Sequence, residues 1–141
     1  AAKVLISEGA DIITQHTDSP APLQTAEKMG VVGFGQASDQ IKFAPKAQLT
    51  AILDVWDSYY ISRVRAAMNG TWTESSTWGG MDTGMVQMAD YTNMPLALRQ
   101  KMEILEADIL SGKFKPFGDL DDGTLAGMME YVDGIDATVP K

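Results

Sequence analysis

The chain has 141 residues, 45% of them apolar, and no cysteine. This length suits one domain with a hydrophobic core, and without cysteine the chain has no disulfide, thiolate nucleophile or cysteine metal ligand. A formal net charge of minus 8 with no basic cluster disfavours nucleic acid as a partner, and no apolar run approaches the roughly 20 residues of a membrane-spanning helix.

The beginning of the chain predicts a helix and then two strands. Residues 1–8 have the pattern of the end of an amphipathic helix that Gly9 stops, and this start within a helix indicates a piece of a longer protein. Apolar runs at 11–15 and 31–34 predict the strands. Neither run alternates with polar residues, so we expect an α/β fold, a Rossmann-like parallel sheet flanked by helices on both faces.

A helix is predicted between these two strands. Asp18 or Ser19 can cap it, and prolines at positions 20 and 22 fit its first turn. Gly30 ends it. The helical spacing predicts a buried stripe of Leu23, Ala26 and Met29.

The second half predicts three further helices. The longest runs from about Lys46 to Asn69, and 72–95 is a connector that contains a possible strand at 85–88. Another helix starts near Pro95 and ends at Gly112, and a last one follows Asp121. The face that the longest helix should bury consists of Leu49, Ile52, Leu53, Trp56, Tyr60, Val64 and Ala67. Trp56, Tyr59 and Tyr60 are accordingly expected mainly in the core.

Each predicted strand leads into a short polar cluster, formed by residues 16–19 and 36–39. A helix is expected after each cluster. In a parallel sheet such clusters lie side by side at the carboxyl ends of neighbouring strands, where open α/β sheets bind ligands. One edge of this sheet is therefore a candidate recognition surface.

Hydrolytic and metal chemistry have weak support in these clusters. His16 with Asp18 and Ser19 has the residue types of a catalytic triad, but neighbours on one turn rarely form one and the G-x-S-x-G elbow is absent. His16, Asp18 and Asp39 suit zinc or non-haem iron without a known ligand spacing, and Asp18 can instead cap a helix. A calcium-like loop at 119–130 has its glycine one position early.

A glycine pattern offers a rival function. Gly33 and Gly35 match the first two glycines of a dinucleotide fingerprint, with Ser38 in the third place, and a nucleotide-dependent enzyme would use this turn. Gly35 can equally serve only to let the backbone turn. Trp78 lies beside two glycines, where an indole can either pack in the protein or stack on a flat ring.

Four segments together resemble the basic membrane protein family, which are type I solute-binding proteins of ABC importers for purine nucleosides and related compounds. These segments are Ala10–Pro20, Gly35–Asp39, Ala44–Thr50 and Tyr91–Pro95, and they follow the family's order along nearly the whole chain. The resemblance implies that residues 1–141 are the C-terminal lobe of a type I periplasmic binding protein, with an N-terminal lobe absent.

The same resemblance implies a transport role without a reaction, a cofactor, a catalytic residue or a metal. The partners would be an ABC permease and a purine base or nucleoside. The protein would be periplasmic or at the cell surface, held to the membrane only through a lipid anchor on a segment absent here.

The implied ligand site uses both polar clusters and the connector. Thr17 and Asp18 would hydrogen-bond ring nitrogens, Gln36 and Asp39 would line the neighbouring loop, and Trp78 would pack near the base. The full expected set is His16, Thr17, Asp18, Gln36, Ala37, Asp39, Trp78 and Gly80.

Departures from the family pattern bear on the ligand. Nucleoside-binding members resemble Gly-Val-Asp-Ser-Asp-Gln where this chain has Gly35–Gln40, so Ala37 replaces the carboxylate that grips the ribose hydroxyls. Asp54 stands where a lysine is expected on the long helix. Both losses favour a bare purine base such as adenine. In addition, the hairpin that the family carries after Phe117 is missing here.

Overall fold

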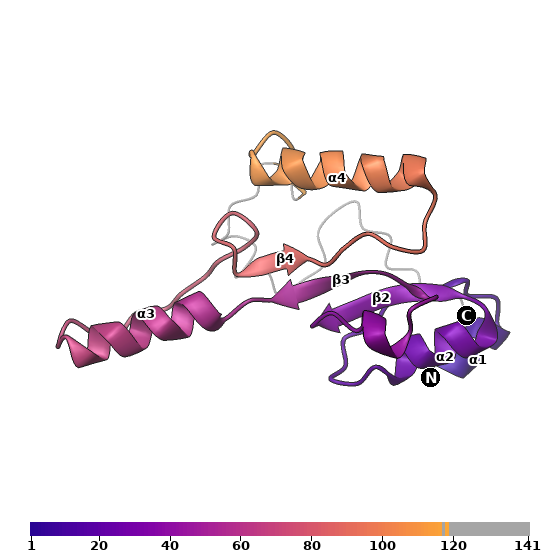
Figure 1. Cartoon of the computed structure of the whole chain (residues 1–141), viewed down its shortest axis with the longest axis horizontal. Coiled ribbons are helices and arrows are strands. Elements are labelled where there is room, and N and C mark those ends of the chain that lie inside the picture. Colours follow the sequence, from indigo (N-terminus) through magenta and orange to yellow (C-terminus); the bar gives the residue numbers. More distant parts are fainter. Residues whose placement is uncertain (117, 119–141) are drawn as a thin grey trace.

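The computed structural model describes residues 1–116 and 118 and contains a four-stranded sheet in the order β1-β2-β3-β4 (Figure 1). The strands are β1 (Ile12–Ile13), β2 (Val32–Ala37), β3 (Gln48–Asp54) and β4 (Val86–Met88). The first three run parallel and β4 is antiparallel to β3. The predicted α/β fold with a mainly parallel sheet is confirmed. The last predicted helix and the calcium-like loop lie outside the described residues.

Helices lie on both sides of this sheet (Figure 1). In that view α1 and α2 lie below the strands and α4 lies above them, while α3 extends away from the sheet. The helical elements are α1 (Ala2–Ser7), α2 (Ala21–Met29), the 3-10 helix η1 (Ile41–Phe43), α3 (Asp57–Met68) and α4 (Leu96–Leu110). Among the helices of the described residues, none combines the length and the hydropathy that crossing a bilayer requires.

The first two helices end where the sequence predicts. Gly9 and Gly30 have φ angles of 105° and 76°, in the left-handed region that only glycine adopts without strain. The α2 cap differs from expectation, because Pro20 is the N-cap and the Ser19 hydroxyl accepts a hydrogen bond from the Ala21 N–H at 3.2 Å. Met29 is 39% exposed, so the predicted buried stripe of α2 extends only over Leu23 and Ala26.

The prediction of one long helix from Lys46 to Asn69 is wrong. Residues 48–54 form β3, which pairs with β2 over five positions, and the helix α3 begins only at Asp57. A short apolar run cannot be assigned to strand or buried helix by its spacing alone. Tertiary pairing decides the outcome here, because Thr50 and Ala51 are buried between neighbouring strands.

The link between β2 and β3 contains no α-helix. Residues 38–47 return the chain to the start of β3 through the 3-10 helix η1, whereas the sequence predicted that the second polar cluster leads into the long helix from about Lys46. The Gln48 side chain, which is 1% exposed, holds this link: its Oε1 accepts from the Gln40 N–H at 3.0 Å and its Nε2 donates to Asp39 Oδ1 at 2.7 Å.

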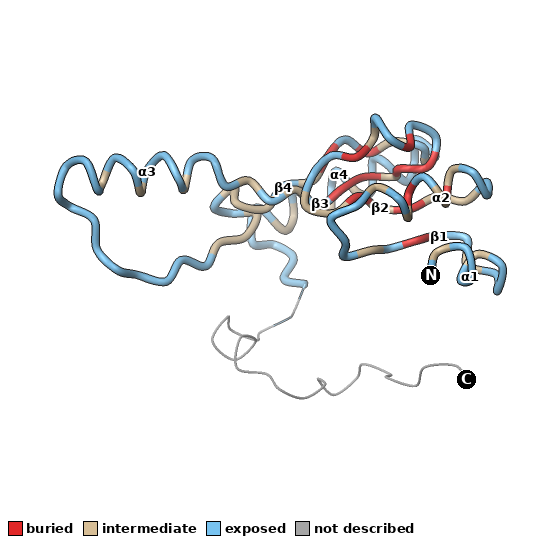
Figure 2. The backbone as a smooth tube through the Cα atoms, turned by 90° about the horizontal axis from the view of Figure 1, so that it is seen from below, coloured by how far each residue is buried: buried red, intermediate tan, exposed pale blue. Residues whose placement is uncertain are grey.

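The hydrophobic core is small and lies against β1 and β2 on the α1/α2 side. Figure 2 shows the buried stretches gathered around the sheet, while α3 is exposed or intermediate along its whole length. The core residues are Ile13, Leu23, Ala26, Ala44 and Ala47, with Ile6, Ala10 and Val31 packed against them. The sequence prediction that the aromatic residues at 56, 59 and 60 are mainly in the core is wrong. They lie outside it because α3 extends away from the sheet and buries none of its residues (Figure 1).

The segment 91–93 links the sheet to α4. Thr92 and Asn93 side chains donate to the Gln48 carbonyl, and the Tyr91 hydroxyl donates to Glu106 Oε2 on α4 at 2.9 Å. Burial and the Glu106 carboxylate raise the pKa of the Tyr91 phenol well above its ordinary value. This hydrogen bond is therefore a main attachment point of α4.

Replacing Tyr91 with Phe should lower the free energy of unfolding by about 1 to 3 kcal/mol near pH 8, because a hydrogen bond to a carboxylate is lost. Above pH 10 the unfolded phenol ionises while the folded one keeps its proton, so wild-type stability falls as pH rises and the difference from the variant shrinks. Urea unfolding at both pH values measures this. Tyr60→Phe, at a 60% exposed position, is the control, and an equal pH dependence of wild type and Tyr91→Phe would contradict the assignment.

Candidate ligand-binding site

The carboxyl ends of three parallel strands form one edge of the sheet. These strands end at Ile13, Ala37 and Asp54, and the antiparallel β4 enters at the same edge. The Val55 N–H donates to the Met85 carbonyl at 2.8 Å, which closes this edge on the β4 side. The polar residues that follow β1 and β2 therefore lie on one rim, here called the carboxyl rim.

A chain of side-chain hydrogen bonds joins the two polar clusters. Thr17 Oγ1 donates to Gln15 Oε1 at 2.7 Å, and Gln15 Nε2 donates to Gln40 Oε1 at 3.0 Å. Gln40 Nε2 then donates to the Gln36 carbonyl at 3.3 Å. The Thr17 hydroxyl is thus linked through two side-chain amides to the backbone carbonyl of Gln36.

Asp39 has a structural role on this rim. Its Oδ1 accepts from the Ile41 N–H at 3.0 Å and from Gln48 Nε2 at 2.7 Å, which fixes the start of η1. Such a turn is a common use of aspartate. One carboxylate oxygen is therefore already engaged, and a ligand contact would use the other.

His16, Thr17 and Asp18 are exposed. Within the described chain, neither the His16 imidazole nor the Asp18 carboxylate has a hydrogen bond, and no group of three or more His, Asp or Glu side chains is placed to hold a metal. The Ser19 hydroxyl is used at the start of α2. The triad and metal interpretations of this cluster thus gain no support.

Ala37 ends β2 in an unusual conformation. Its φ angle is 61°, in the left-handed region, where a residue with a Cβ pays about 1 kcal/mol or more. The backbone turns sharply here and takes Ser38 and Asp39 over the sheet. Ala37 pairs with Leu53, so Asp54 lies one residue beyond it on the neighbouring strand.

Gly80 lies at the same edge on the far side of β3, since its carbonyl accepts from the Val86 N–H at 3.3 Å. Trp78 precedes it by two residues and is 78% exposed. Three strand spacings of about 4.8 Å separate β1 from β4, so these residues are at the opposite end of the rim from Thr17.

Sequence reasoning missed several residues of the rim. Gln15, Gln40 and Gln48 form its hydrogen-bond scaffold, and Asp54 moves from a predicted helix to the end of a central strand. The sequence signal that could have identified these rim residues is the cluster of glutamines around two strand ends. Glutamine has no motif of its own, and Gln48 was assigned to a helix.

The glycine fingerprint does not form a phosphate-binding turn. Gly33 and Gly35 lie inside β2, and no α-helix opens after them. A Cβ on Gly33 would lie 2.6 Å from the Ile13 carbonyl oxygen, and one on Gly35 would lie 2.6 Å from the Ala51 Cβ. Close packing explains both glycines.

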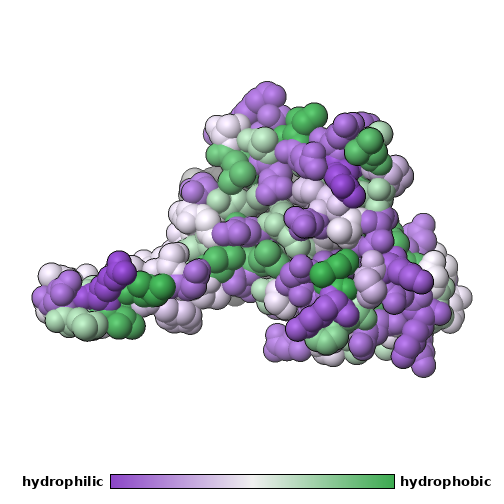
Figure 3. All heavy atoms as spheres, in the orientation of Figure 1, coloured by the Kyte–Doolittle hydropathy of each residue, from purple (hydrophilic) through white to green (hydrophobic). Residues whose placement is uncertain are grey.

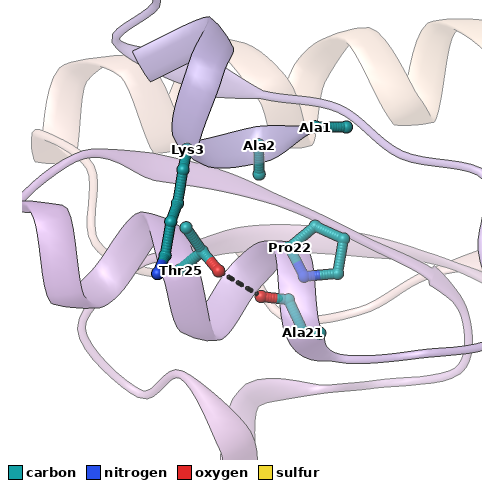
Figure 4. A pocket seen from close by; sticks show the side chains of 6 residues that line it. All are labelled: Ala1, Ala2, Lys3, Ala21, Pro22 and Thr25. Carbon is teal, nitrogen blue, oxygen red and sulfur yellow. Dashed lines mark hydrogen bonds between the residues drawn. The ribbon is translucent and has the colours of Figure 1, made fainter. Parts of the chain in front are cut away.

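A separate hollow of about 330 Å³ lies between α1 and α2 (Figure 4). None of the predicted site residues lines it. Small side chains and the Lys3 stem form its wall, and the Thr25 hydroxyl donates to the Ala21 carbonyl. It offers few polar groups for recognition, so the carboxyl rim remains the candidate site.

Comparison with known proteins shows which protein family the chain matches. Residues 1–115 match the model of the Bmp family, described as ABC transporter substrate-binding protein PnrA-like. The chain is 48% identical over 157 aligned positions to a purine-binding protein of Brucella abortus, and 27% identical over 148 to a putative ABC transporter glucose-binding protein of Haloferax volcanii. The alignments cover all of this chain but only 45% and 38% of those relatives.

Solved structures share the fold. A transcriptional activator of the comK gene from Bacillus halodurans superposes with a TM-score of 0.69 at 16% identity, over 81% of this chain and 41% of its own. An ABC transporter solute-binding protein from Aeropyrum pernix gives 0.61 at 15% identity, over 81% and 42%. The chain thus spans less than half the length of the proteins it matches.

Gly35→Ala should lower the free energy of unfolding by about 1 to 3 kcal/mol, because the new methyl group overpacks β2 against β3. Denaturant unfolding of the chain without any ligand measures this. Gly80→Ala is the matched control, since its Cβ would meet only the Asp82 carboxylate, at 3.3 Å. Unchanged stability of Gly35→Ala together with lost nucleotide binding would revive the phosphate-turn interpretation.

Proposed function

The chain belongs to the Bmp family of PnrA-like ABC transporter substrate-binding proteins, and on that premise we propose that residues 1–141 form the C-terminal lobe of an importer's binding protein whose ligand is a purine base. The carboxyl rim would be one wall of an interlobe cleft. The observation that carries this proposal is the Thr17–Gln15–Gln40–Gln36 hydrogen-bond chain, which joins two polar loops at the edge where open sheets bind ligands.

The polar groups of the rim suit the edges of an adenine ring. An amide such as Gln36 both donates and accepts, so it can pair with an amino group and a ring nitrogen at once. Asp18 would accept from the exocyclic amino group, and the Thr17 hydroxyl can serve a ring nitrogen in either role. His16 and Asp39 would line the same wall.

The charge of the rim argues for a neutral ligand. Asp18, Asp39 and Asp54 bring three carboxylates to this edge, in a chain of net charge minus 8. A phosphate group would be repelled there. A nucleobase carries no charge and offers N–H groups to carboxylates, so it fits better than a nucleotide.

Two positions favour the bare base over a nucleoside. The family resemblance implies a carboxylate in nucleoside-binding members where this chain has Ala37, and a lysine, expected on a helix, where this chain has Asp54 at the end of β3. Their strands are adjacent, with Ala37 paired to Leu53, so both changes fall at one place on the rim. A ribose held there would lack both partners.

Trp78 and Gly80 would complete the site at the β4 side. An exposed indole can stack on a flat ring, an interaction worth about 1 to 3 kcal/mol for a base. Closure of a second lobe onto the rim would bring this indole against the ligand and signal the bound state to an ABC permease.

Membership of the Bmp family also suggests how and where the protein would work. The protein would bind its ligand without a chemical reaction and would work outside the cytoplasmic membrane, in the periplasm or at the cell surface. A lipid anchor on another segment would hold it to the membrane.

Half a cleft should hold its ligand poorly. If about half of a micromolar ligand's 8 kcal/mol is lost, affinity falls toward millimolar. Calorimetry should detect no submicromolar adenine binding to residues 1–141 alone. A chimera of this chain with the part of the Brucella relative that lies outside the alignment should bind adenine more tightly than adenosine. Tight binding by the isolated chain would contradict the two-lobe proposal.

In the same chimera, Gln36→Ala should weaken adenine binding about 10- to 100-fold, because one amide pair is lost. Gln24→Ala removes the same side chain from an exposed position on α2 and should leave affinity unchanged. Isothermal calorimetry of the two variants measures both affinities for adenine. Equal affinities would show that Gln36 does not contact the ligand.

A further inference from the structure

The helix α3 presents a wide apolar face that nothing in the described part of the chain covers. None of its residues is buried. Spacing of three, four and seven residues puts the apolar side chains on one side of the helix, as in a helix that packs on a core. This side, called here the α3 face, consists of Trp56, Tyr60, Ile61, Val64, Ala67 and Met68. Its five larger side chains are between 46% (Trp56) and 81% (Met68) exposed.

Figure 3 shows this helix as a projecting arm with hydrophobic atoms at its surface. Aromatic contacts order its first turn, since the rings of Trp56, Tyr59 and Tyr60 lie 5.6 to 6.0 Å apart. A short helix of this kind has little stability of its own in water. A surface that covers its apolar side would stabilise it.

Arg63, at the border of the α3 face, is held by residues that follow the helix. Arg63 Nη2 donates to the Thr73 carbonyl at 2.8 Å, and its guanidinium lies 5.3 Å from the Trp72 ring and 5.9 Å from the Tyr59 ring. These contacts attach only the start of the connector to α3, since residues 71–78 are all exposed. Within the part of the chain that the structure describes, the α3 face is the apolar side of this helix that stays open for a partner.

The position of α3 determines that a polypeptide bound to it also lies near the carboxyl rim. The chain leaves the sheet at Asp54 and returns at Val86, two paired residues at the carboxyl rim. The helix thus stands beyond the same edge as the candidate ligand site. A polypeptide that covers the α3 face would at the same time lie opposite the rim.

We infer that the α3 face is the docking surface for the other lobe of a longer protein, so that one contact both covers the helix and closes the ligand cleft. This inference rests on the proposed function for the identity of that lobe. The lengths support it, since the chain spans 45% of the Brucella relative and 41% of the Bacillus structure, which leaves more than half of such a protein outside it.

Two other occupants fit less well. The acidic net charge of minus 8 disfavours an anionic membrane surface, which attracts basic amphipathic helices. A second copy would cover the helix but would bring another set of acidic rim residues, including Asp18 and Asp54, toward the first.

The test is Val64→Asp, placed in the centre of the α3 face, in the isolated chain and in the chimera with the unaligned part of the Brucella relative. In residues 1–141 alone the melting temperature should not change, because Val64 is 59% exposed. In the chimera it should fall by about 5 °C or more, because a charge would be buried in an apolar contact. Ser62→Asp, on the opposite side of the helix, should be neutral in both.

The outcomes separate this inference from the proposed function. An unchanged melting temperature of the Val64→Asp chimera that still binds adenine would overturn the docking surface alone. A lowered melting temperature in a chimera that binds no purine would support docking and contradict the ligand. A dimer of residues 1–141 that Val64→Asp dissociates, or vesicle binding that it abolishes, would replace the lobe by another occupant.

A second measurement needs no chimera. Hydrogen exchange of residues 1–141 should show α3 amides exchanging far faster than those of β2 and β3, because a helix with no buried residue opens readily. Amides of α3 protected as well as those of the central strands would overturn the inference.

Discussion

The parallel pairing of β2 with β3 is the constraint on which the rest of this structure depends. It needs glycine at Gly35, because any side chain there would collide with Ala51, and it needs a short return segment, which the buried Gln48 side chain holds through Gln40 and Asp39. Once the pair forms in this register, the ends of both strands and the loop after β1 come to one edge. The carboxyl rim is a consequence of that pairing.

The same geometry suits the rim to ligand recognition. The Gln15 and Gln40 side chains are tied to one another, to the Thr17 hydroxyl and to the Gln36 backbone carbonyl, so the Thr17 hydroxyl and the backbone at Gln36 are held in place before any ligand arrives. Preorganised polar groups around a flat apolar surface lower the entropic cost of binding. A site of this kind is complete only when a second surface closes over it. The chain leaves the sheet at this edge to form α3, and such a surface would attach to the exposed α3 face.

The sequence predicted the fold class, the first two helix ends and the position of the polar clusters, since glycine conformation and apolar runs are local signals. It failed for residues 48–54, where a helical spacing of Leu49, Ile52 and Leu53 coincided with a strand that only pairing with β2 and β4 reveals. It also placed Trp56 and Tyr60 in a core that this chain does not supply to them. The family resemblance pointed to the rim residues, but the glutamine scaffold depends on long-range contacts and became visible only in the structure.

The most direct test of this account is a nuclear magnetic resonance titration of isotopically labelled residues 1–141 with millimolar adenine, a concentration that reveals weak binding to half a cleft. The account predicts that amide signals of residues 16–18, 36–40 and 78–80 shift together and saturate with one dissociation constant, while those lining the hollow between α1 and α2 stay in place. Shifts confined to that hollow, or no shift on the rim at any concentration, would contradict it.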